Sequence, residues 1–410
     1  MISEPKVTND TGSYLFLWER EGIACHVGRI KDSREGLSAD LLFKTTAPGS
    51  STHLHQARLN LTATRSRKEF AHHLAGRRDD VDWEAVLEQV CVYVVEKERE
   101  GEPIEEIWPE GATPPRYLLY PLIPEGIPTI IFGEGASGKS TLALILAACA
   151  ILPWEDNPLG LIPPKDATNV LYLDYESDAQ DIKWKLHALC RGMGLPSFPL
   201  HYRRSFLPLA DDVDQIRAIL RQKNAHLLIV DSLGMASGGD LNSTEPTLRF
   251  FHALRSLNTT SLLTAHTAKS ELTKTKTVFG SSFFNFLTRS IWEVKKAQEL
   301  EEDSLSLALF HRKFNRGKPF KPLGFRFSFG EDTLTVARQD AREDFLDSFP
   351  LSIRVLEALK GGSLTRAELM EELGETKPDT LSQILQRLKR RGQVNRVGDA
   401  WGLAAPREDT

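Results

Sequence analysis

The feature that most constrains this chain is the octapeptide GEGASGKS at residues 133–140. It follows the apolar run 129–132 and precedes an apolar stretch over 141–152, which is the order strand, glycine-rich loop, helix. Glycines let backbone N–H groups turn toward a phosphate, and the N-terminus of the helix adds a favourable partial charge. The residues that this motif assigns to a phosphate-binding loop are Gly133, Glu134, Gly135, Ala136, Ser137, Gly138, Lys139, Ser140 and Thr141.

The end of the motif indicates which ligand the loop binds. Lys139 is expected to reach the β- and γ-phosphates of a nucleoside triphosphate, and the hydroxyl of Ser140 to ligate Mg²⁺. The three glycines also satisfy the dinucleotide pattern GxGxxG, but that pattern leaves Lys139 and Ser140 unexplained. The acidic residue that it requires, about 20 positions further on, falls in a proline-containing loop near Asp156. ATP and Mg²⁺ are therefore the expected ligands.

Three other apolar runs end in residues that suit the same chemistry. One run ends in Asp231, a carboxylate that either supports the Mg²⁺ or caps the next turn. A second run leads into Asp174 and Glu176; either could activate the attacking water, and the position just past the strand favours Glu176. A third run ends in His266, which either contacts the γ-phosphate or has a structural role.

The chain divides into segments with different patterns. Residues 1–100 combine strand-like runs at 14–18, 23–30 and 41–46 with helical patterns at 65–76 and 83–97, so we expect an α+β domain of unknown role. Four prolines mark 101–115 as a linker. Residues 116–332 alternate apolar strands with helices, which predicts an α/β domain with a mainly parallel sheet. The predicted strands are 129–132, 169–174, 226–231, 261–266, 290–295 and 304–310.

The last segment, 349–404, predicts three short helices at 353–360, 365–373 and 378–391, followed by a hairpin. That order is typical of a winged-helix domain. Its basic residues gather at the end of the third helix and at the start of the hairpin: Arg387, Lys389, Arg390, Arg391 and Arg396. Such a helix could enter the major groove of DNA, or the domain could bind protein and the charges favour the helix dipole.

Composition excludes several classes of protein. The four cysteines lie far apart and form no CxxC pair, which argues against a zinc site or a disulfide framework and for reduced thiols. The longest apolar run is shorter than the roughly 18 residues of a membrane span, and no secretion signal begins the sequence. A cytoplasmic protein without membrane contact is expected. The net charge of −5 neither indicates nor excludes a nucleic-acid partner.

Over about 116–330 these motifs resemble the RecA-like ATPases, most closely the hexameric replicative helicases of the RepA type from plasmids and their phage relatives. LYLDYESD at 171–178 resembles the family's strand that ends in a catalytic glutamate, here Glu176. LLIVDSL at 227–233 resembles its magnesium-binding strand, here ending in Asp231. LLTAHTAK at 262–269 resembles its sensor strand, here ending in His266.

Two further stretches extend the resemblance to assembly. GSSFFNFLTRS at 280–290 is similar to the segment that delivers an arginine into the neighbouring subunit's nucleotide, which falls on Arg289. HRKFNRGKPF at 311–320 resembles the Lys-x-Asn-x-Gly signature and implies roles for Lys313 and Asn315. The resemblance thus implies a hexamer or another ring, with positive charge supplied to the γ-phosphate from a neighbour.

The resemblance also implies where DNA would bind. Loops at 235–245 and 269–276 correspond to loops that line the channel of RecA-like rings, although solvated loops are the simpler interpretation. The basic run 65–78 is more typical of a solvated helix face. The resulting hypothesis is an ATP-hydrolysing motor on DNA, a helicase of the replicative type. The alternative is a DNA-bound regulator or recombination mediator that uses ATP as a switch and unwinds nothing.

Overall fold

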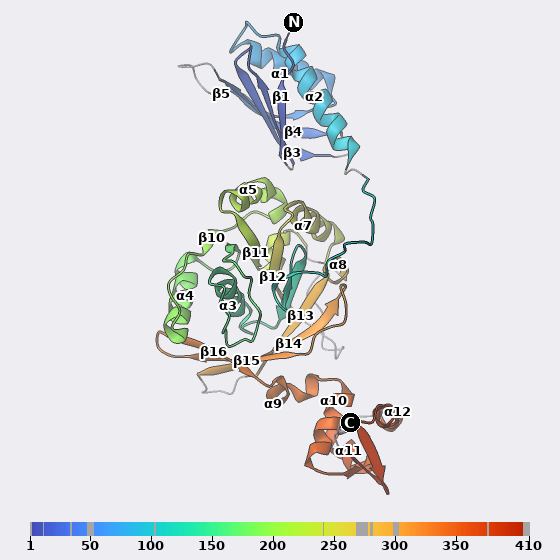
Figure 1. Cartoon of the computed structure of the whole chain (residues 1–410). Helices are drawn as coiled ribbons and strands as arrows, with labels where there is room; N and C mark the ends of the chain where they lie inside the picture. The colour runs from blue at the N-terminus through green and yellow to red at the C-terminus, as the bar shows by residue number, and fades with distance from the viewer. Residues whose placement is uncertain are drawn as a thin grey trace. The chain divides into compact units, whose positions relative to one another are not determined.

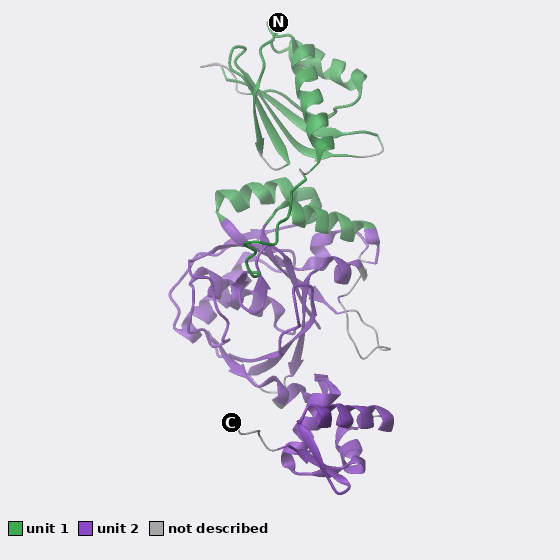
Figure 2. Ribbon diagram, turned by 45° about the vertical axis from the view of Figure 1, so that its right-hand side comes forward, with its two compact units in different colours: residues 1–115, 207–224, 245–258 green, residues 116–206, 225–244, 259–410 purple. Residues whose placement is uncertain are grey.

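A computed structural model describes residues 2–10, 12–32, 35–46, 53–101, 104–240, 242–267, 278, 282–297, 303–374 and 377–404. The chain divides into two compact units (Figure 2). The first comprises residues 1–115, 207–224 and 245–258, and the second comprises 116–206, 225–244 and 259–410. Helix α5 (Leu209–Gln222) and nearly all of α7 (Thr244–Ser256) therefore belong to the first unit, although they come from the middle of the sequence.

The N-terminal part is an antiparallel meander followed by two helices (Figure 1). Its strands are β1 (Lys6–Asp10), β2 (Ser13–Trp18), β3 (Ile23–Lys31), β4 (Ser38–Thr45) and β5 (His53–Asn60), and its helices are α1 (Thr64–Ala75) and α2 (Trp83–Glu100). Alternate residues of β2, among them Phe16 and Trp18, are buried against a core that α2 completes with its valines. The Asp82 side chain caps α2 by accepting from the N–H of Ala85.

The second unit contains a nine-stranded sheet in the order β10-β9-β11-β12-β8-β13-β14-β15-β16. The six strands from β10 to β13 in this order pair in parallel, and β14, β15 and β16 add antiparallel strands at one edge. The strands are β8 (Pro128–Gly133), β9 (Asn169–Asp174), β10 (His201–Arg204), β11 (Ala225–Asp231), β12 (Thr260–His266), β13 (Ser290–Ala297), β14 (Ser304–Phe314), β15 (Leu323–Phe329) and β16 (Leu334–Gln339). The predicted α/β architecture with a mainly parallel sheet is confirmed.

All six strands predicted for the core are present, and three more, β10, β15 and β16, were not predicted. Strand β16 lies beyond residue 332, where the sequence analysis ended the core, so that boundary was placed too early. A small ribbon of β6 (Tyr117–Leu119) and β7 (Ile123–Pro124) precedes β8. The other helices of this part are α4 (Ala179–Met193), α6 (Leu233–Ser237), α8 (Ser282–Leu287) and α9 (Ala341–Phe345).

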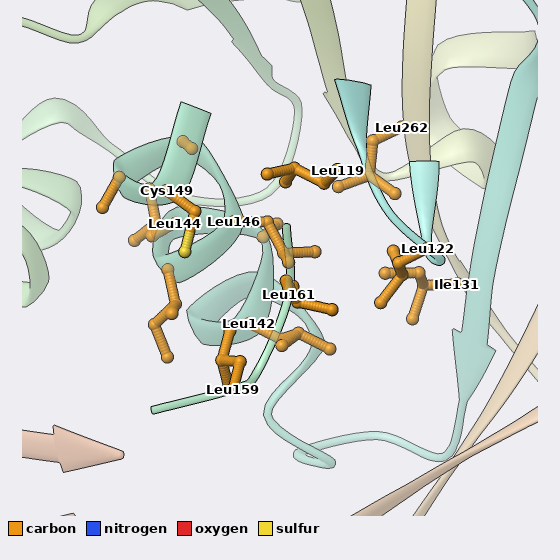
Figure 3. Packing of buried hydrophobic residues seen from close by; sticks show 14 of the residues in the cluster. Leu119, Leu122, Ile131, Leu142, Leu144, Leu146, Cys149, Leu159, Leu161 and Leu262 are labelled. Atoms are coloured by element: carbon orange, nitrogen blue, oxygen red, sulfur yellow. The ribbon is translucent and has the colours of Figure 1, made fainter. Parts of the chain in front are cut away.

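Helix α3 (Lys139–Ile151) lies at the centre of the main core. Every residue from Leu142 to Ala150 is buried, which is the behaviour of a helix that is apolar on all sides. Its leucines pack among side chains from β8, β12 and the 118–122 and 159–161 segments (Figure 3). This burial fixes the position of the helix N-terminus, where the glycine-rich loop ends.

The C-terminal segment has its own core and a three-stranded sheet in the order β17-β19-β18. Its elements are η1 (Leu346–Ser348), α10 (Leu351–Ala358), η2 (Leu359–Gly361), β17 (Leu364–Thr365), α11 (Arg366–Leu373), α12 (Pro378–Arg390), β18 (Val394–Val397) and β19 (Ala400–Leu403). Three helices and a terminal hairpin therefore follow one another in the expected order, while the winged-helix assignment stays a prediction. No helix in the described part of the chain is both long and apolar enough to cross a membrane.

Candidate nucleotide-binding site

The glycine-rich loop connects β8 to α3, as the motif requires. A Cβ atom at Gly133 would lie 2.6 Å from the carbonyl oxygen of Val294 on the neighbouring strand β13, so only glycine fits there. Gly138 has φ 74° and precedes the first residue of α3, a left-handed conformation that favours glycine. Ala136 has φ 52° and therefore adopts the same region with a side chain. Ser140 and Thr141 are half-buried in the first turn of α3.

Lys139 is only 7% exposed and lies inside the loop. Its Nζ donates to the carbonyl oxygens of Gly133 at 3.2 Å and Glu134 at 2.6 Å, and to the hydroxyl of Ser137 at 3.3 Å. Burial lowers the pKa of Lys139, and the nearby carboxylates of Asp231 and Glu176 oppose that shift. The Lys139 ammonium group is therefore held by oxygens of the loop, and phosphate oxygens of a bound nucleotide could replace them as its partners.

Asp231 ends β11 and is 6% exposed. Its Oδ2 accepts from the hydroxyl of Tyr172 on β9 at 2.6 Å, and its Oδ1 accepts from the hydroxyl of Thr264 on β12. Burial, with Asp231 as neighbour, raises the pKa of Tyr172, so this phenol stays a donor. Hydrogen bonds of this kind orient a carboxylate for a metal ion, and the oxygens of Asp231 and Ser140 are the ligand type that Mg²⁺ prefers.

The structure gives Asp174 and Glu176 different surroundings. Asp174 is 1% exposed, and its Oδ1 accepts from the backbone N–H groups of Glu176 at 3.0 Å and Ser177 at 2.8 Å. Its Oδ2 accepts from the hydroxyl of Tyr202 at 3.1 Å. Asp174 therefore holds the turn that presents Glu176, whose own carboxylate is partly exposed.

Glu176, Ser232 and His266 meet at the carboxyl edge of the sheet. Oε1 of Glu176 accepts from the hydroxyl of Ser232 and lies 3.5 Å from Nε2 of His266. These three residues follow or end β9, β11 and β12, which are adjacent in the sheet, and the loop after β8 comes next. The side chains expected from three separate motifs are thus collected at one edge.

Arg289 and Lys313 lie near each other but are used differently. The Arg289 side chain is exposed and has no hydrogen bond or ion pair within the described residues, while its carbonyl accepts from the N–H of Asn315 at 3.0 Å. Nζ of Lys313 donates to the carbonyls of Asn285 at 2.5 Å and Phe286 at 3.2 Å, near the end of α8. Burial and the charge of Arg289 lower the pKa of Lys313. Lys313 therefore holds α8 beside Arg289 within its own chain.

The loops expected to contact DNA are described only in part. Residues 233–237 of the first form α6, on which the Met235 side chain is 61% exposed, and the stretch 269–276 lies outside the described residues. In α1 and just after it, Arg65, Arg67 and Arg78 each pair with a carboxylate, and of the three only the Arg65 side chain is largely exposed.

Sequence reasoning missed four polar residues of this site. Tyr172 and Thr264 lie inside apolar strands, and Ser232 lies within LLIVDSL but was given no role there. The fourth, Lys296, reaches the phosphate-binding loop from β13, and its Nζ donates to Gly135 and Ala136. The available signal was position, because each lies in or just after a predicted strand of the same sheet.

Comparison with known proteins gives a family match and similar solved structures. A family model described as an AAA domain matches residues 104–271. One similar solved structure is a KaiC-like protein from the hyperthermophilic archaeon Pyrococcus horikoshii, with 17% sequence identity and a TM-score of 0.36, covering 57% of this chain and 99% of that one. No curated protein matches the sequence. The loop, the carboxylates, the sheet and the AAA match together support a RecA-like P-loop ATPase.

Proposed function

We propose that this protein is an ATP-hydrolysing motor that acts on DNA, with strand separation of the replicative-helicase kind as its task. The observation that carries the ATPase part is the position of Glu176. Its carboxylate is partly exposed, is held by Ser232 and His266, and lies on the sheet edge that also carries Lys139 and Asp231.

The chemistry assigned to these residues is transfer of the γ-phosphoryl group to water. Glu176 accepts a proton from the attacking water as its oxygen bonds to the γ-phosphorus, and the bond from that phosphorus to the β–γ bridging oxygen breaks. Lys139 stabilises the charge that develops on the phosphate oxygens. Ser140 and Asp231 would hold Mg²⁺, which supplies further neutralisation of the phosphates when bound. His266 keeps the Glu176 carboxylate in place.

Assembly into a hexamer or another ring is the second part of the proposal. An exposed arginine without a partner in its own chain, as Arg289 is within the described residues, has an obvious use at a neighbour's γ-phosphate. Lys313 supports this use by fixing the end of α8 just before Arg289. The active unit would then be the interface between two copies.

Contact with DNA is the third part, and helix α12 supports it. Leu381, Leu385 and Leu388 bury one face of this helix in the C-terminal core. The opposite face and the end of the helix expose Arg387, Lys389, Arg390 and Arg391, none of which forms an ion pair within the described residues. A solvated cluster of four cations suits a phosphate backbone.

The same C-terminal segment favours a second candidate, a DNA-bound regulator that uses ATP as an assembly switch. One experiment separates the two. ATP hydrolysis is measured with and without single-stranded DNA, and displacement of a labelled strand from a tailed duplex is followed in parallel, with Lys139→Ala as the control. We expect DNA-stimulated hydrolysis and displacement. Stimulated hydrolysis without displacement would favour the regulator, and the absence of hydrolysis would refute both the motor and its proposed site.

A further inference from the structure

A lysine outside the motif, Lys296, donates hydrogen bonds to the phosphate-binding loop. Lys296 lies near the end of β13, which pairs with β8 in parallel. Its Nζ donates to the carbonyl oxygen of Gly135 at 3.3 Å and to that of Ala136 at 3.2 Å. These two carbonyls belong to the apex of the loop, between Gly133 and Lys139.

The direction of these hydrogen bonds bears on the ligand. In a trans peptide unit the C=O and the following N–H point in opposite directions. When Lys296 holds the carbonyls of Gly135 and Ala136 on its own side, the N–H groups of Ala136 and Ser137 point to the other side. Those N–H groups are the ones that a loop of this kind offers to phosphate oxygens.

The backbone conformation of Ala136 is one that a hydrogen bond from Lys296 would stabilise. Its φ of 52° lies in the left-handed region, which a residue with a Cβ atom occupies at a cost and glycine occupies freely. A hydrogen bond from an ammonium group to the carbonyl of the same residue favours this conformation over its alternatives. The sequence thus places alanine where glycine would fit most easily, and β13 supplies the contact that compensates.

We propose that Lys296 is a positioning residue that keeps the apex of the loop in its phosphate-binding conformation. The inference rests on the proposed function, because it takes the loop to bind ATP. The positive charge of Lys296 also opposes protonation of Lys139, which agrees with its closeness to the site. Lys295, the preceding residue on β13, has the same charge but forms no hydrogen bond to the loop within the described residues, so it offers a control.

The test is direct titration of the full chain with Mg²⁺–ATP by calorimetry, with folding checked by circular dichroism. Lys296→Met should raise the Kd by about fivefold to tenfold, the size expected for losing a pair of charge-assisted hydrogen bonds that water partly replaces. The hydrolysis rate at saturating ATP should change much less than the Kd. Lys296→Arg should retain most of the affinity, and Lys295→Met should bind as the unaltered protein does.

A double substitution makes the test specific to the backbone of Ala136. In an Ala136→Gly background the effect of Lys296→Met should shrink, because glycine adopts the positive φ without support. An unchanged Kd for Lys296→Met, or an equal increase with and without Ala136→Gly, would overturn the inference. Failure of the unaltered protein to bind ATP would instead refute the proposed function, and binding without hydrolysis would refute only its catalytic part.

Discussion

At the scale of single residues, the two carboxylates that follow β9 differ in what surrounds them. Asp174 is buried and accepts three hydrogen bonds, so its carboxylate oxygens hold the turn. Glu176 is partly exposed, and the described residues that contact its Oε1 are Ser232 and His266. A general base must reach its water, and only Glu176 is free to do so.

We therefore expect Glu176→Gln to bind ATP normally and to hydrolyse it about 10² to 10⁴ times more slowly, the usual effect of removing a general base. Asp174→Asn should act on stability instead, because an amide replaces one acceptor oxygen with a donor in a buried turn. Phosphate release, ATP titration and thermal unfolding of both variants check this. Normal turnover in Glu176→Gln together with inactive, stably folded Asp174→Asn would reverse the assignment.

A second prediction at this scale concerns pH and His311. Its ring stacks on Trp292 at 4.0 Å, and its Nδ1 accepts from the N–H of Phe320 at 3.1 Å. Burial lowers the pKa of His311 to about 4 from 6.5. The unfolded chain therefore binds a proton between these values that the folded chain does not, and the free energy of unfolding falls as pH falls through this window. Above pH 6.5 this contribution is constant.

His311→Gln should flatten the dependence of stability on pH between 4 and 6.5, by up to about 3 kcal/mol across the window. Denaturant unfolding at pH 5 and pH 7.5 measures the effect, and His226→Gln, which alters an exposed histidine, is the control. The same slope in His311→Gln as in the unaltered protein would show that other groups carry the acid sensitivity.

Much of this site could be predicted because its main residues stand at the ends of apolar runs. Asp231 and His266 are marked in this way, Lys139 is marked by the glycine-rich motif that follows such a run, and the sheet brings the strands side by side. Position just past the strand favoured Glu176 over Asp174, but it could not show that the turn aims two N–H groups at Asp174. Lys296 was missed since its partners are backbone carbonyls, which leave no trace in the sequence.

At the scale of elements, α8 and the start of β13 place Arg289 at the surface of its own chain. Arg289→Ala should bind ATP through its intact loop but lack activity, and Lys139→Ala should be inactive with an intact arginine. Mixed oligomers of the two should recover activity, because some interfaces then combine an intact Lys139 in one chain with an intact Arg289 in its neighbour. An arginine supplied in trans typically contributes about 10³ to 10⁵ in rate, so a small fraction of such interfaces is detectable.

The control is each variant alone at the total protein concentration of the mixture, with mixed oligomers verified by native mass spectrometry. No recovery in verified mixtures would mean that the site is completed within one chain, and the ring proposal would lose its main support. Arg312→Ala serves as a second comparison, since that arginine already pairs with the buried Glu293 in its own chain.

Helix α12 carries the fourth prediction. Replacing Arg387, Lys389, Arg390 and Arg391 by Gln in the full chain should weaken DNA binding, and the slope of log affinity against log salt should fall by about 0.9 for each phosphate that the helix no longer neutralises. Fluorescence anisotropy over a salt series measures both quantities. Arg354→Gln is a matched control, because that side chain instead donates to the Leu373 carbonyl. An unchanged slope would assign the exposed cluster to contacts with protein.

Prediction of the elements themselves failed where their patterns were weak. β10 has four residues, two of them Arg, and lies at the edge of the sheet, where burial imposes little pattern. β15 begins after a proline and contains Gly324, which stands where a Cβ would meet the backbone of Gln339. β5 buries few of its residues and reads as polar. The apolar parallel strands had no such ambiguity because both of their faces are buried.

At the scale of the whole molecule, the sequence predicted domains that follow one another along the chain. In the structure, each of the two compact units is made of several separate stretches. Helix α5 and nearly all of α7 belong to the first compact unit, although the elements next to them in sequence belong to the second: β10 and β11 for α5, and α6 and β12 for α7. The core sheet continues through β16, and α9 then packs Phe345 with Phe310 of β14 and with Phe349. Such groupings depend on contacts between residues distant in sequence, which periodicity cannot reveal. A truncation meant to spare the core should therefore keep Phe349.

Because the site is assembled from the ends of four separate strands, ATP binding tests whether the central sheet is correctly paired. Lys139, Glu176, Asp231 and His266 approach one another only when β8, β9, β11 and β12 are all paired in register. A ligand that binds only the folded form stabilises it, by about 2.7 kcal/mol at a concentration of 100 times the Kd. Mg²⁺–ATP should accordingly raise the melting temperature, and Lys139→Ala should remove that shift. A preparation with normal helix content but no ATP-dependent rise in melting temperature would contain chains whose strands are not paired in the native register.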